Sequence, residues 1–411
     1  MEPCTVEEHL ERVLGGVQPM TPVAQPLLDT LGLACAERVV ATISLPTFDN
    51  SAMDGYAVRR ADVAAATAAQ PVTLPVVGEI GAGQATLRVL APGAAAKIMT
   101  GAPIPDGADA VVPYEWTDRG VAQVRIDQVP EPGQHVRPAG DDVSEGDLLV
   151  EEGTVLGPRQ LGLLASVGRA TVLARPRPRV VVLSTGSELR NPGEELGHDS
   201  IYDGNSYMLA AAVRRAGAIA HRVGIVPDDP DAFLKTLNDQ LVRADLVVTS
   251  GGVSQGDFDI VKEVLRRQGV WFGPVAMQPG KPQGFGLIGA DPGDRQVPIV
   301  TLPGNSVSSY ISFEMFVLPA IRTLMGLTPV SRPTFDARLT GGVSSPEGRR
   351  QFLRGRAGTD AEGPYVEPVG GPGSHLVGAL AEANSLIVVP EEVTALAPGD
   401  RVHVLMLDTD F

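Results

Sequence analysis

The chain has 411 residues, of which 43% are hydrophobic and 20% are charged, and its formal net charge at pH 7 is −16. This length predicts about two to four domains, since one domain typically takes about 100–200 residues. No basic stripe offsets the negative charge, which argues against nucleic acid as the main partner. An anionic ligand would need a locally positive site made of backbone N–H groups, Lys or Arg side chains, or a metal ion.

The N-terminal stretch MEPCTVEEHL has no basic region followed by an apolar run, so we expect no signal peptide. The most apolar long segment, residues 307–321, carries Glu314 and predicts a buried helix rather than a membrane span. Cys4 and Cys35 form no CxxC motif, which favours free thiols and disfavours a zinc site. We therefore expect a cytoplasmic protein without a membrane partner.

The first 45 residues predict helices. TVEEHLERVL has apolar residues at helical spacing after a Thr cap, and QPLLDTLGLACAERVV predicts a second helix with an extended exit. Between residues 46 and 143, short apolar runs such as VTLPVVGEI alternate with Pro and Gly turns, which is typical of a small β module. Residues 144–178 return to a helical stretch and a Pro-rich link. We therefore expect an N-terminal helical and linker domain, 1–45 with 144–178, into which the β module 46–143 is inserted.

Residues 179–327 alternate apolar strands, such as RVVVLSTG and ADLVVTSGG, with helical patterns. This alternation predicts a central three-layer α/β domain with a mostly parallel sheet that is covered on both faces. Residues 332–411 hold short strands and turns, which predict a C-terminal β domain resembling a barrel. The expected fold class is a multidomain α/β plus β protein.

Three of the predicted strands end in glycine-containing loops, within STGSEL, TSGGVSQGDFD and LPGNSVSSY. Ligands of such sheets bind beyond the carboxyl ends of the strands, where backbone N–H groups can hold an anion. A capped strand-to-helix turn explains each loop at least equally well alone, and explains the residues of LPGNSVSSY better, but three loops at one edge favour a binding site. The predicted substrate-binding residues are Thr185, Gly186, Ser187, Ser250, Gly251, Gly252, Pro303, Gly304 and Asn305.

Charged side chains accompany these loops. The carboxylates of Glu188, Asp257 and Asp259 suit a hydrated Mg²⁺, although an Asp at a helix start is also a common cap. Lys281, in the rigid stretch QPGKPQGFG, can be held toward an anion, whereas a lone Lys on a turn is usually solvated. In the β module, Thr100 and Asp142 lie in turns that are either structural or able to reach a site.

Several long stretches together resemble the MoeA family, the molybdopterin molybdenumtransferases, to which the E domain of gephyrin is similar. The stretches run in order over nearly the whole chain: FDNSAMDGYAVR, IMTGAPIPDGADAVVPYE, STGSEL, SGGVSQGDFD, PGKPQGFG and LPGNSVSSY. The resemblance implies an enzyme that inserts molybdate into adenylylated molybdopterin, releasing molybdenum cofactor and AMP with the help of Mg²⁺. It also implies a four-domain subunit and a homodimer whose active site is shared between subunits. The molybdopterin adenylyltransferase and the acceptor molybdoenzymes are the partner proteins that it implies.

The resemblance also implies roles for individual residues. Mg²⁺ or its waters would be bound by Glu188 and Asp259, and molybdate by Lys281, Ser308 and Arg354. The implied catalytic residues are Asp54, Thr100, Asp142, Glu188 and Lys281. Asp54 and Asp142 would position water or ligand hydroxyls, or relay protons. Asp49 and Asn50 are expected to shape the loop that presents Asp54.

Three residues depart from the family's usual pattern. Gln278 stands where Lys is usual, Ser306 where Pro is usual, and Asp257 where Glu is usual. The Gln removes one positive contact to the oxyanion, so a tungstate-inserting paralogue and a non-catalytic scaffold or cofactor carrier remain alternatives. Retention of the acidic residues and the lysine together favours the enzyme: Asp54, Asp142, Glu188, Asp259 and Lys281.

Overall fold

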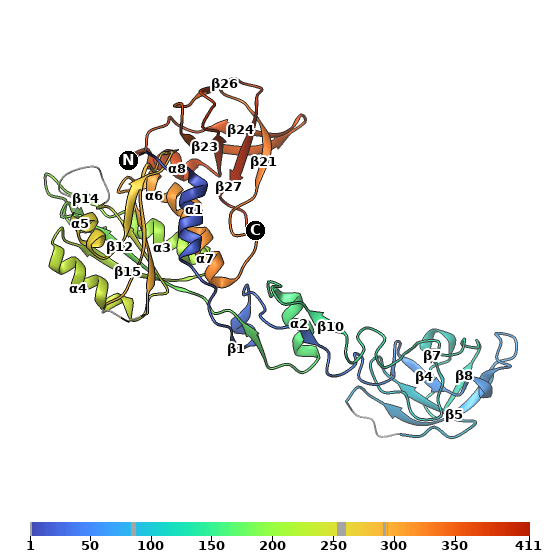
Figure 1. The fold of residues 1–411 in the computed structure, drawn as a ribbon. Helices are drawn as coiled ribbons and strands as arrows, with labels where there is room; N and C mark the ends of the chain where they lie inside the picture. The colour runs from blue at the N-terminus through green and yellow to red at the C-terminus, as the bar shows by residue number, and fades with distance from the viewer. Residues whose placement is uncertain (1, 84–87, 253–259, 291–292, 294) are drawn as a thin grey trace. The chain divides into compact units, whose positions relative to one another are not determined.

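The structure is a computed structural model that describes residues 2–83, 88–252, 260–290, 293 and 295–411. The chain divides into two compact units (Figure 1). The larger unit takes in Met1–Gln25, Gly32–Ala36 and Leu173–Phe411, and the smaller unit Pro26–Leu31 and Glu37–Val172. Two short strands, β1 (Val23–Pro26) and β11 (Thr171–Ala174), cover positions where the sequence passes between units.

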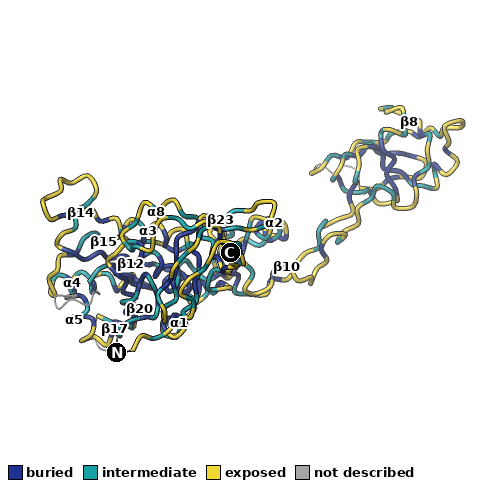
Figure 2. Tube along the Cα trace, turned by 90° about the horizontal axis from the view of Figure 1, so that it is seen from above, coloured by how far each residue is buried: buried dark blue, intermediate teal, exposed yellow. Residues whose placement is uncertain are grey.

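A six-stranded sheet forms the centre of the larger unit. Its order is β15 (Ile219–Val226), β12 (Arg179–Thr185), β16 (Leu246–Ser250), β20 (Val297–Leu302), β19 (Pro282–Ile288) and β17 (Trp271–Pro274). The first four strands are parallel, and β19 and β17 continue the sheet antiparallel. The strands predicted in RVVVLSTG and ADLVVTSGG are confirmed as β12 and β16. Strands β12 and β20 are almost entirely buried, as the dark blue in Figure 2 shows, and such strands appear in sequence as continuous apolar runs.

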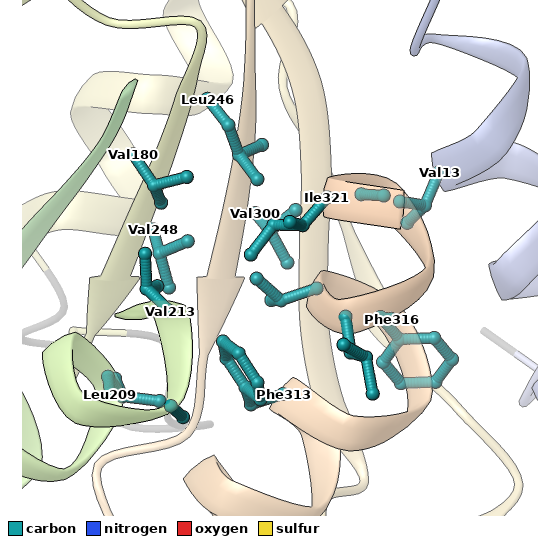
Figure 3. Close-up of a cluster of buried hydrophobic side chains, with 14 of the residues drawn as sticks. Val13, Val180, Leu209, Val213, Leu246, Val248, Val300, Phe313, Phe316 and Ile321 are labelled. Carbon is teal, nitrogen blue, oxygen red and sulfur yellow. The ribbon is translucent and has the colours of Figure 1, made fainter. Parts of the chain in front are cut away.

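Helices cover both faces of this sheet, so the predicted three-layer arrangement is confirmed. The helices are α1 (Val6–Gly15), α3 (Asn205–Arg215), α4 (Pro230–Leu241), α5 (Ile260–Arg267), α6 (Ser306–Ser312) and α7 (Leu318–Met325). On one face, alternate strand residues such as Val180, Val248 and Val300 pack against α3, α6, α7 and α1 (Figure 3). On the other face, Val181 and Val247 pack against α4 and α5. One π-helical turn, Phe313–Val317, joins α6 to α7.

The C-terminal region of the larger unit forms a closed five-stranded barrel. The strands run in the order β23 (Arg350–Asp360), β24 (Gly363–Pro368), β21 (Thr334–Leu339), β27 (Arg401–Met406) and β25 (Ser385–Val389). Pairing of β25 with β23 closes the barrel, which confirms the predicted barrel-like end of the chain. Short elements complete the larger unit: β13 (Leu189–Arg190), β14 (Ile201–Tyr202), β18 (Met277–Gln278), β22 (Val343–Ser344), β26 (Ala395–Leu396) and α8 (Val377–Glu382).

The smaller unit is built around a five-stranded sheet. Its order is β7 (Ala110–Pro113), β4 (Gly55–Val58), β6 (Ala95–Ile98), β5 (Val72–Ile80) and β8 (Gln123–Ile126). Buried side chains of β4 alternate between two cores, with Tyr56 and Val58 in one and Ala57 in the other. The unit also contains β2 (Val39–Val40), β3 (Asn50–Ser51), β9 (Val136–Arg137), β10 (Leu148–Val150) and α2 (Pro158–Ser166).

The predicted second helix near the N-terminus is wrong. The structure has β1 followed by a single 3-10 turn, Leu27–Thr30, in place of this helix. Leu28 is 85% exposed, whereas the consecutive residues Leu33, Ala34 and Cys35 are all buried. Three buried residues in a row do not fit the single apolar face of a surface helix.

Strands β18 and β19 of the larger unit are among those that were not predicted. The stretch around Lys281 was expected to be a loop, but β18 ends just before it and β19 begins directly after it. Gly284 in β19 lies so close to Phe272 that an added Cβ would be 2.7 Å from its ring. The glycines and prolines that suggested a loop instead allow a tight strand pairing. Among the described residues, no helix combines the length and hydropathy that crossing a bilayer would require.

Candidate active site

The carboxyl ends of three parallel strands meet at one edge of the sheet in the larger unit. In register, Ser184 lies opposite Ser250, and Ser250 lies opposite Leu302. The following loops are in close contact, because a Cβ on Gly251 would lie 2.7 Å from the Thr185 carbonyl oxygen. Gly251 also has a φ of +94°, a conformation that favours glycine. The structure thus brings the three predicted loops together.

Polar side chains line this edge. Asn205, at the start of α3, donates to the Ser250 hydroxyl at 2.8 Å and to the Gly304 carbonyl at 2.6 Å. The Ser250 and Ser309 hydroxyl oxygens are 3.2 Å apart. Two buried oxygens, Thr185 Oγ1 and Asn205 Oδ1, have no hydrogen-bond partner among the described residues. Buried polar atoms are normally paired, so these two oxygens are candidates for contacts with a ligand. Asn205 was not predicted.

The loop after β12 presents carboxylates at the same edge. A Cβ on Gly186 would lie 2.5 Å from Glu188 Oε2, so the Glu188 carboxylate folds back over this glycine. The Ser187 backbone N–H donates to Asp228 Oδ2 at 2.9 Å. Asp228, which was not predicted, thus brings a second carboxylate to this loop. The predicted metal ligand Asp259 and its neighbour Asp257 lie outside the described residues. Within the described ranges, no group of three or more His, Cys, Asp or Glu side chains is arranged to hold a metal.

A cavity of about 470 Å³ lies in the larger unit, and Lys281 and Ser308 both line it. The pairing of β18 with β23 places Gln278 beside Gln351, which brings Arg349 to the same cavity. Arg349 donates to Gln278 Oε1 at 3.5 Å. The complete lining is Met277, Gln278, Pro279, Gly280, Lys281, Pro282, Ser308, Arg349, Pro372, Gly373, Ser374 and His375. Arg349, Ser374 and His375 were not predicted.

The cavity and the edge of the sheet share the start of α6. Asn305 donates to the Ser374 hydroxyl at 3.0 Å, and the Val307 N–H donates to the Ser374 carbonyl at 3.3 Å. On α6 itself, Ser308 lines the cavity while Ser309 contacts Ser250 at the sheet edge. Helix α6 therefore presents polar side chains both to the cavity and to the edge of the sheet.

Arg354 has a different environment from the one implied for it. Its side chain is nearly fully buried in β23 and donates to the carbonyl oxygens of Gly371 and Gly373. Burial also lowers the pKa of its guanidinium. Arg354 therefore supports the loop that forms one wall of the cavity, and its direct contact with molybdate stays a prediction.

In the smaller unit, the structure brings Asp54 and Thr100 together. Asp54 Oδ1 accepts from the Thr100 backbone N–H at 2.7 Å and from its hydroxyl at 2.8 Å. Both bonds lower the pKa of Asp54, and the bond from the backbone N–H has the larger effect. Asp54 is therefore ionised at neutral pH. Asp142 is exposed and lies in a turn where its N–H donates to the Leu45 carbonyl.

The expected loop-shaping residues of the smaller unit are confirmed. Asp49 Oδ1 accepts from the Ala139 N–H at 2.7 Å, and the Asn50 side chain donates to the Phe48 carbonyl at 3.1 Å. Both polar side chains are thus used in holding the backbone next to Asp54.

Comparison with known proteins gives matches over nearly the whole chain. Residues 4–168 match the MoeA N-terminal region (domain I and II), residues 181–323 a probable molybdopterin binding domain, and residues 336–407 the MoeA C-terminal region (domain IV). Molybdopterin molybdenumtransferase 2 of Mycobacterium tuberculosis is 46% identical over 407 residues, which cover 97% of this chain and 98% of the relative. Molybdopterin molybdenumtransferase of Haemophilus influenzae is 37% identical and covers 90% of both chains.

A solved structure agrees with the sequence matches. The crystal structure of a molybdopterin biosynthesis MoeA protein from Pyrococcus horikoshii covers 100% of both chains, with a TM-score of 0.82 and 33% identity. The likeness thus extends over all of the sequence and its fold. The chain therefore belongs to the MoeA family of molybdopterin molybdenumtransferases, which are enzymes.

Proposed function

We propose that the chain inserts molybdate into adenylylated molybdopterin, with Mg²⁺-dependent release of AMP and molybdenum cofactor. The observation that carries the proposal is the cavity lined by Lys281, Ser308 and Arg349, which adjoins three glycine loops at the carboxyl edge of the sheet. The names of the relatives in this family support the same reaction. Adenylylated molybdopterin at the glycine loops and molybdate in the cavity would thus lie side by side.

The glycine loops would hold the phosphate and pterin parts of the substrate. The missing side chains of Gly186 and Gly251 let these loops pack closely against Glu188 and Thr185, which gathers their backbone groups at this edge. The unpartnered oxygens of Thr185 and Asn205 can accept from donor groups of the pterin, and the Thr185 hydroxyl can also donate to a phosphate.

Lys281 and Arg349 would bind the oxyanion. A single cation–anion contact at about 4 Å is worth roughly 4 kcal/mol before desolvation, at an effective dielectric near 20. Two cations therefore offset much of the repulsion that a chain of net charge −16 exerts on molybdate. Arg349, bonded to Gln278, supplies a positive charge beside the position where the family's usual lysine is absent. Ser308 and Ser374 would add neutral hydrogen bonds.

Mg²⁺ would be held by Glu188, with Asp259 as the second predicted ligand. The Glu188 carboxylate fits a hard cation because it is exposed and folded over a glycine of the phosphate loop. When bound, Mg²⁺ neutralises phosphate charge and polarises the phosphate link. Glu188 would hold the cation at the loop after β12, while the backbone of the glycine loops would orient the phosphates.

The smaller unit would contribute Asp54, Thr100 and Asp142 from the partner in a homodimer. Asp54 enters as a carboxylate with a lowered pKa, so it suits orienting water or a ligand hydroxyl better than donating a proton. The family resemblance supports the shared site and the four-domain division at 1–45 with 144–178, 46–143, 179–327 and 332–411. We further propose a cytoplasmic location, with the molybdopterin adenylyltransferase and acceptor molybdoenzymes as neighbours in the pathway.

AMP release tests the proposal. The full chain is incubated with adenylylated molybdopterin, Mg²⁺ and molybdate, and AMP is followed by chromatography. We expect release that requires both Mg²⁺ and molybdate. No release from the folded protein would contradict the enzyme and favour a scaffold or carrier, and release with tungstate alone would identify a tungstate-inserting enzyme.

A further inference from the structure

The cavity receives its polar groups from elements that are not continuous in sequence. Lys281 lies on the short connection between β18 and β19, whereas Ser308 lies on α6. A lysine side chain is flexible, so its ammonium reaches a defined place only if the backbone at its base is held. The structure contains one buried group that connects this backbone to α6.

That group is the Gln283 side chain, which is 1% exposed. Its Nε2 donates to the Gly280 carbonyl and to the Ser312 hydroxyl oxygen, both at 2.6 Å. A carbonyl oxygen only accepts, so the amide nitrogen must face it, and this orientation also directs an N–H toward Ser312. The carbonyl that it holds belongs to the residue directly before Lys281.

Gly280 is pressed against the same serine. Its φ is +108°, and an added Cβ would lie 2.9 Å from Ser312 Oγ. Ser312 is four residues after Ser308 on α6, so the two hydroxyls lie one turn apart on the same face. The bonds of Gln283 thus tie the base of Lys281 to the helix face that presents Ser308.

This arrangement has a cost, which argues for a role other than stability. Gln283 Oε1 is buried and has no hydrogen-bond partner among the described residues. An unsatisfied buried oxygen destabilises a fold, and an apolar side chain of similar size would avoid it.

We propose that Gln283 and Ser312 are positioning residues for oxyanion binding, which set the Lys281 ammonium relative to the Ser308 hydroxyl. Neither residue touches the oxyanion; each acts through the loop and helix that it joins. The inference rests on the proposed function, because it takes this cavity as the molybdate site.

Three variants test the inference in the full chain: Gln283→Leu, Ser312→Ala and the double variant. The molybdate Kd is measured by calorimetry, and the molybdate KM by AMP release. We expect each variant to raise both values about tenfold, since small misplacements of binding groups cost factors of this order or more. Binding of adenylylated molybdopterin is expected to stay within about twofold of wild type. Gln160→Leu, which removes a glutamine-to-backbone bond in the smaller unit, is the control and should leave both molybdate values unchanged.

The double variant separates positioning from stability. The double variant removes both side chains of the Gln283–Ser312 bond, and the Gly280 carbonyl loses its donor as it does in Gln283→Leu, so the double variant should be at least as stable as Gln283→Leu. Positioning predicts that its molybdate affinity nevertheless stays low, and a crystal structure should show the Gly280–Lys281 backbone displaced. Wild-type molybdate affinity in any folded variant would overturn the inference. The wild-type protein tests the proposed function separately. If it shows no molybdate-dependent AMP release, the proposed function is wrong, whatever the variants do.

Discussion

At the scale of single residues, His9 is a buried imidazole that the candidate active site does not use. It is fully buried in α1 and packs against Phe316 and Trp271, with ring centroids 4.6 and 5.2 Å away. Both ring nitrogens lack hydrogen-bond partners among the described residues. Burial, and secondly the charge of Arg12, lowers the pKa of His9 from 6.5 to about 3. The folded state therefore holds His9 neutral where the unfolded chain would protonate it.

This difference predicts a loss of stability in mild acid. Because the pKa of His9 is lower in the folded state, the free energy of unfolding is unaffected by His9 above about pH 6.5. It falls as the pH drops from 6.5 toward 3, since only the unfolded chain then binds the proton. At pH 5 the free energy of unfolding should drop by about 2 kcal/mol through this residue alone. Urea unfolding at pH 7.5 and pH 5 measures the drop, and His9→Phe should reduce it by about that amount. The exposed His198→Gln is the control; an equal pH dependence in wild type and His9→Phe would contradict the prediction.

The two cations of the cavity give a second residue-scale prediction. Lys281→Ala and Arg349→Ala should each raise the molybdate KM by about 10–100-fold, since each removes a charge from a partly enclosed site. The affinity for adenylylated molybdopterin should change much less. Lys235→Ala, on the exposed side of α4, controls for the loss of one positive charge from the whole chain. An unchanged molybdate titration in either cavity variant would remove that residue from the oxyanion site.

Sequence reasoning found one of these cations and not the other, for a physical reason. Lys281 stands in a rigid Pro-Gly stretch, which is a local signal. Arg349 has no such signal, and it reaches the cavity only because β18 pairs with β23, far along the chain. Asn205 was missed for the same reason, since its partners Ser250 and Gly304 come from other strands' loops.

At the scale of elements, apolar sequence patterns predicted the strands that are buried on both faces. They failed to predict a strand in which glycines allow close packing. Strands β12, β16 and β20 are continuous apolar runs, and their parallel order places their loops at one edge. Strand β19 contains Gly284 and Gly286, whose missing side chains admit Phe272 and Val270. Composition alone cannot distinguish such a strand from a turn, because the reason for each glycine lies in the neighbouring strand.

The loop after β16 gives an element-scale prediction. Gly251→Ala places a Cβ 2.7 Å from the Thr185 carbonyl oxygen at a φ of +94°, so the loop must shift. We expect a loss of about 1–3 kcal/mol in the free energy of unfolding and a large loss of AMP release. Gly162→Ala in α2 is the matched control, because an added Cβ there meets nothing within 4 Å. That control should keep full activity and gain up to about 1 kcal/mol; wild-type AMP release in Gly251→Ala would contradict the predicted role of this loop.

At the scale of the whole molecule, the predicted catalytic and molybdate-binding residues are divided between the two units. Lys281, Ser308 and Glu188 belong to the larger unit, and Asp54 and Thr100 to the smaller. Neither set alone has both an oxyanion cavity and the Asp54–Thr100 pair. A shared site in a homodimer would join the two sets from different chains, as proposed above.

Subunit mixing tests this sharing. At molybdate concentrations near the wild-type KM, Asp54→Ala and Lys281→Ala are each expected to be nearly inactive as homodimers, because each lacks one part of every site. Heterodimers of the two, isolated with two affinity tags, contain one site whose larger unit retains Lys281 and whose smaller unit retains Asp54. They should show about half of the wild-type rate of AMP release per dimer, since one of two equivalent sites is intact.

A second heterodimer supplies the control. Lys281→Ala combined with Arg349→Ala places both changes in the larger unit, so no site has an intact cavity and activity should stay low. Inactive heterodimers of Asp54→Ala with Lys281→Ala would mean that each site is built from one chain, because mixing then restores nothing. A chain that stays monomeric while releasing AMP would lead to the same conclusion, and Asp54 would then have to act within its own subunit.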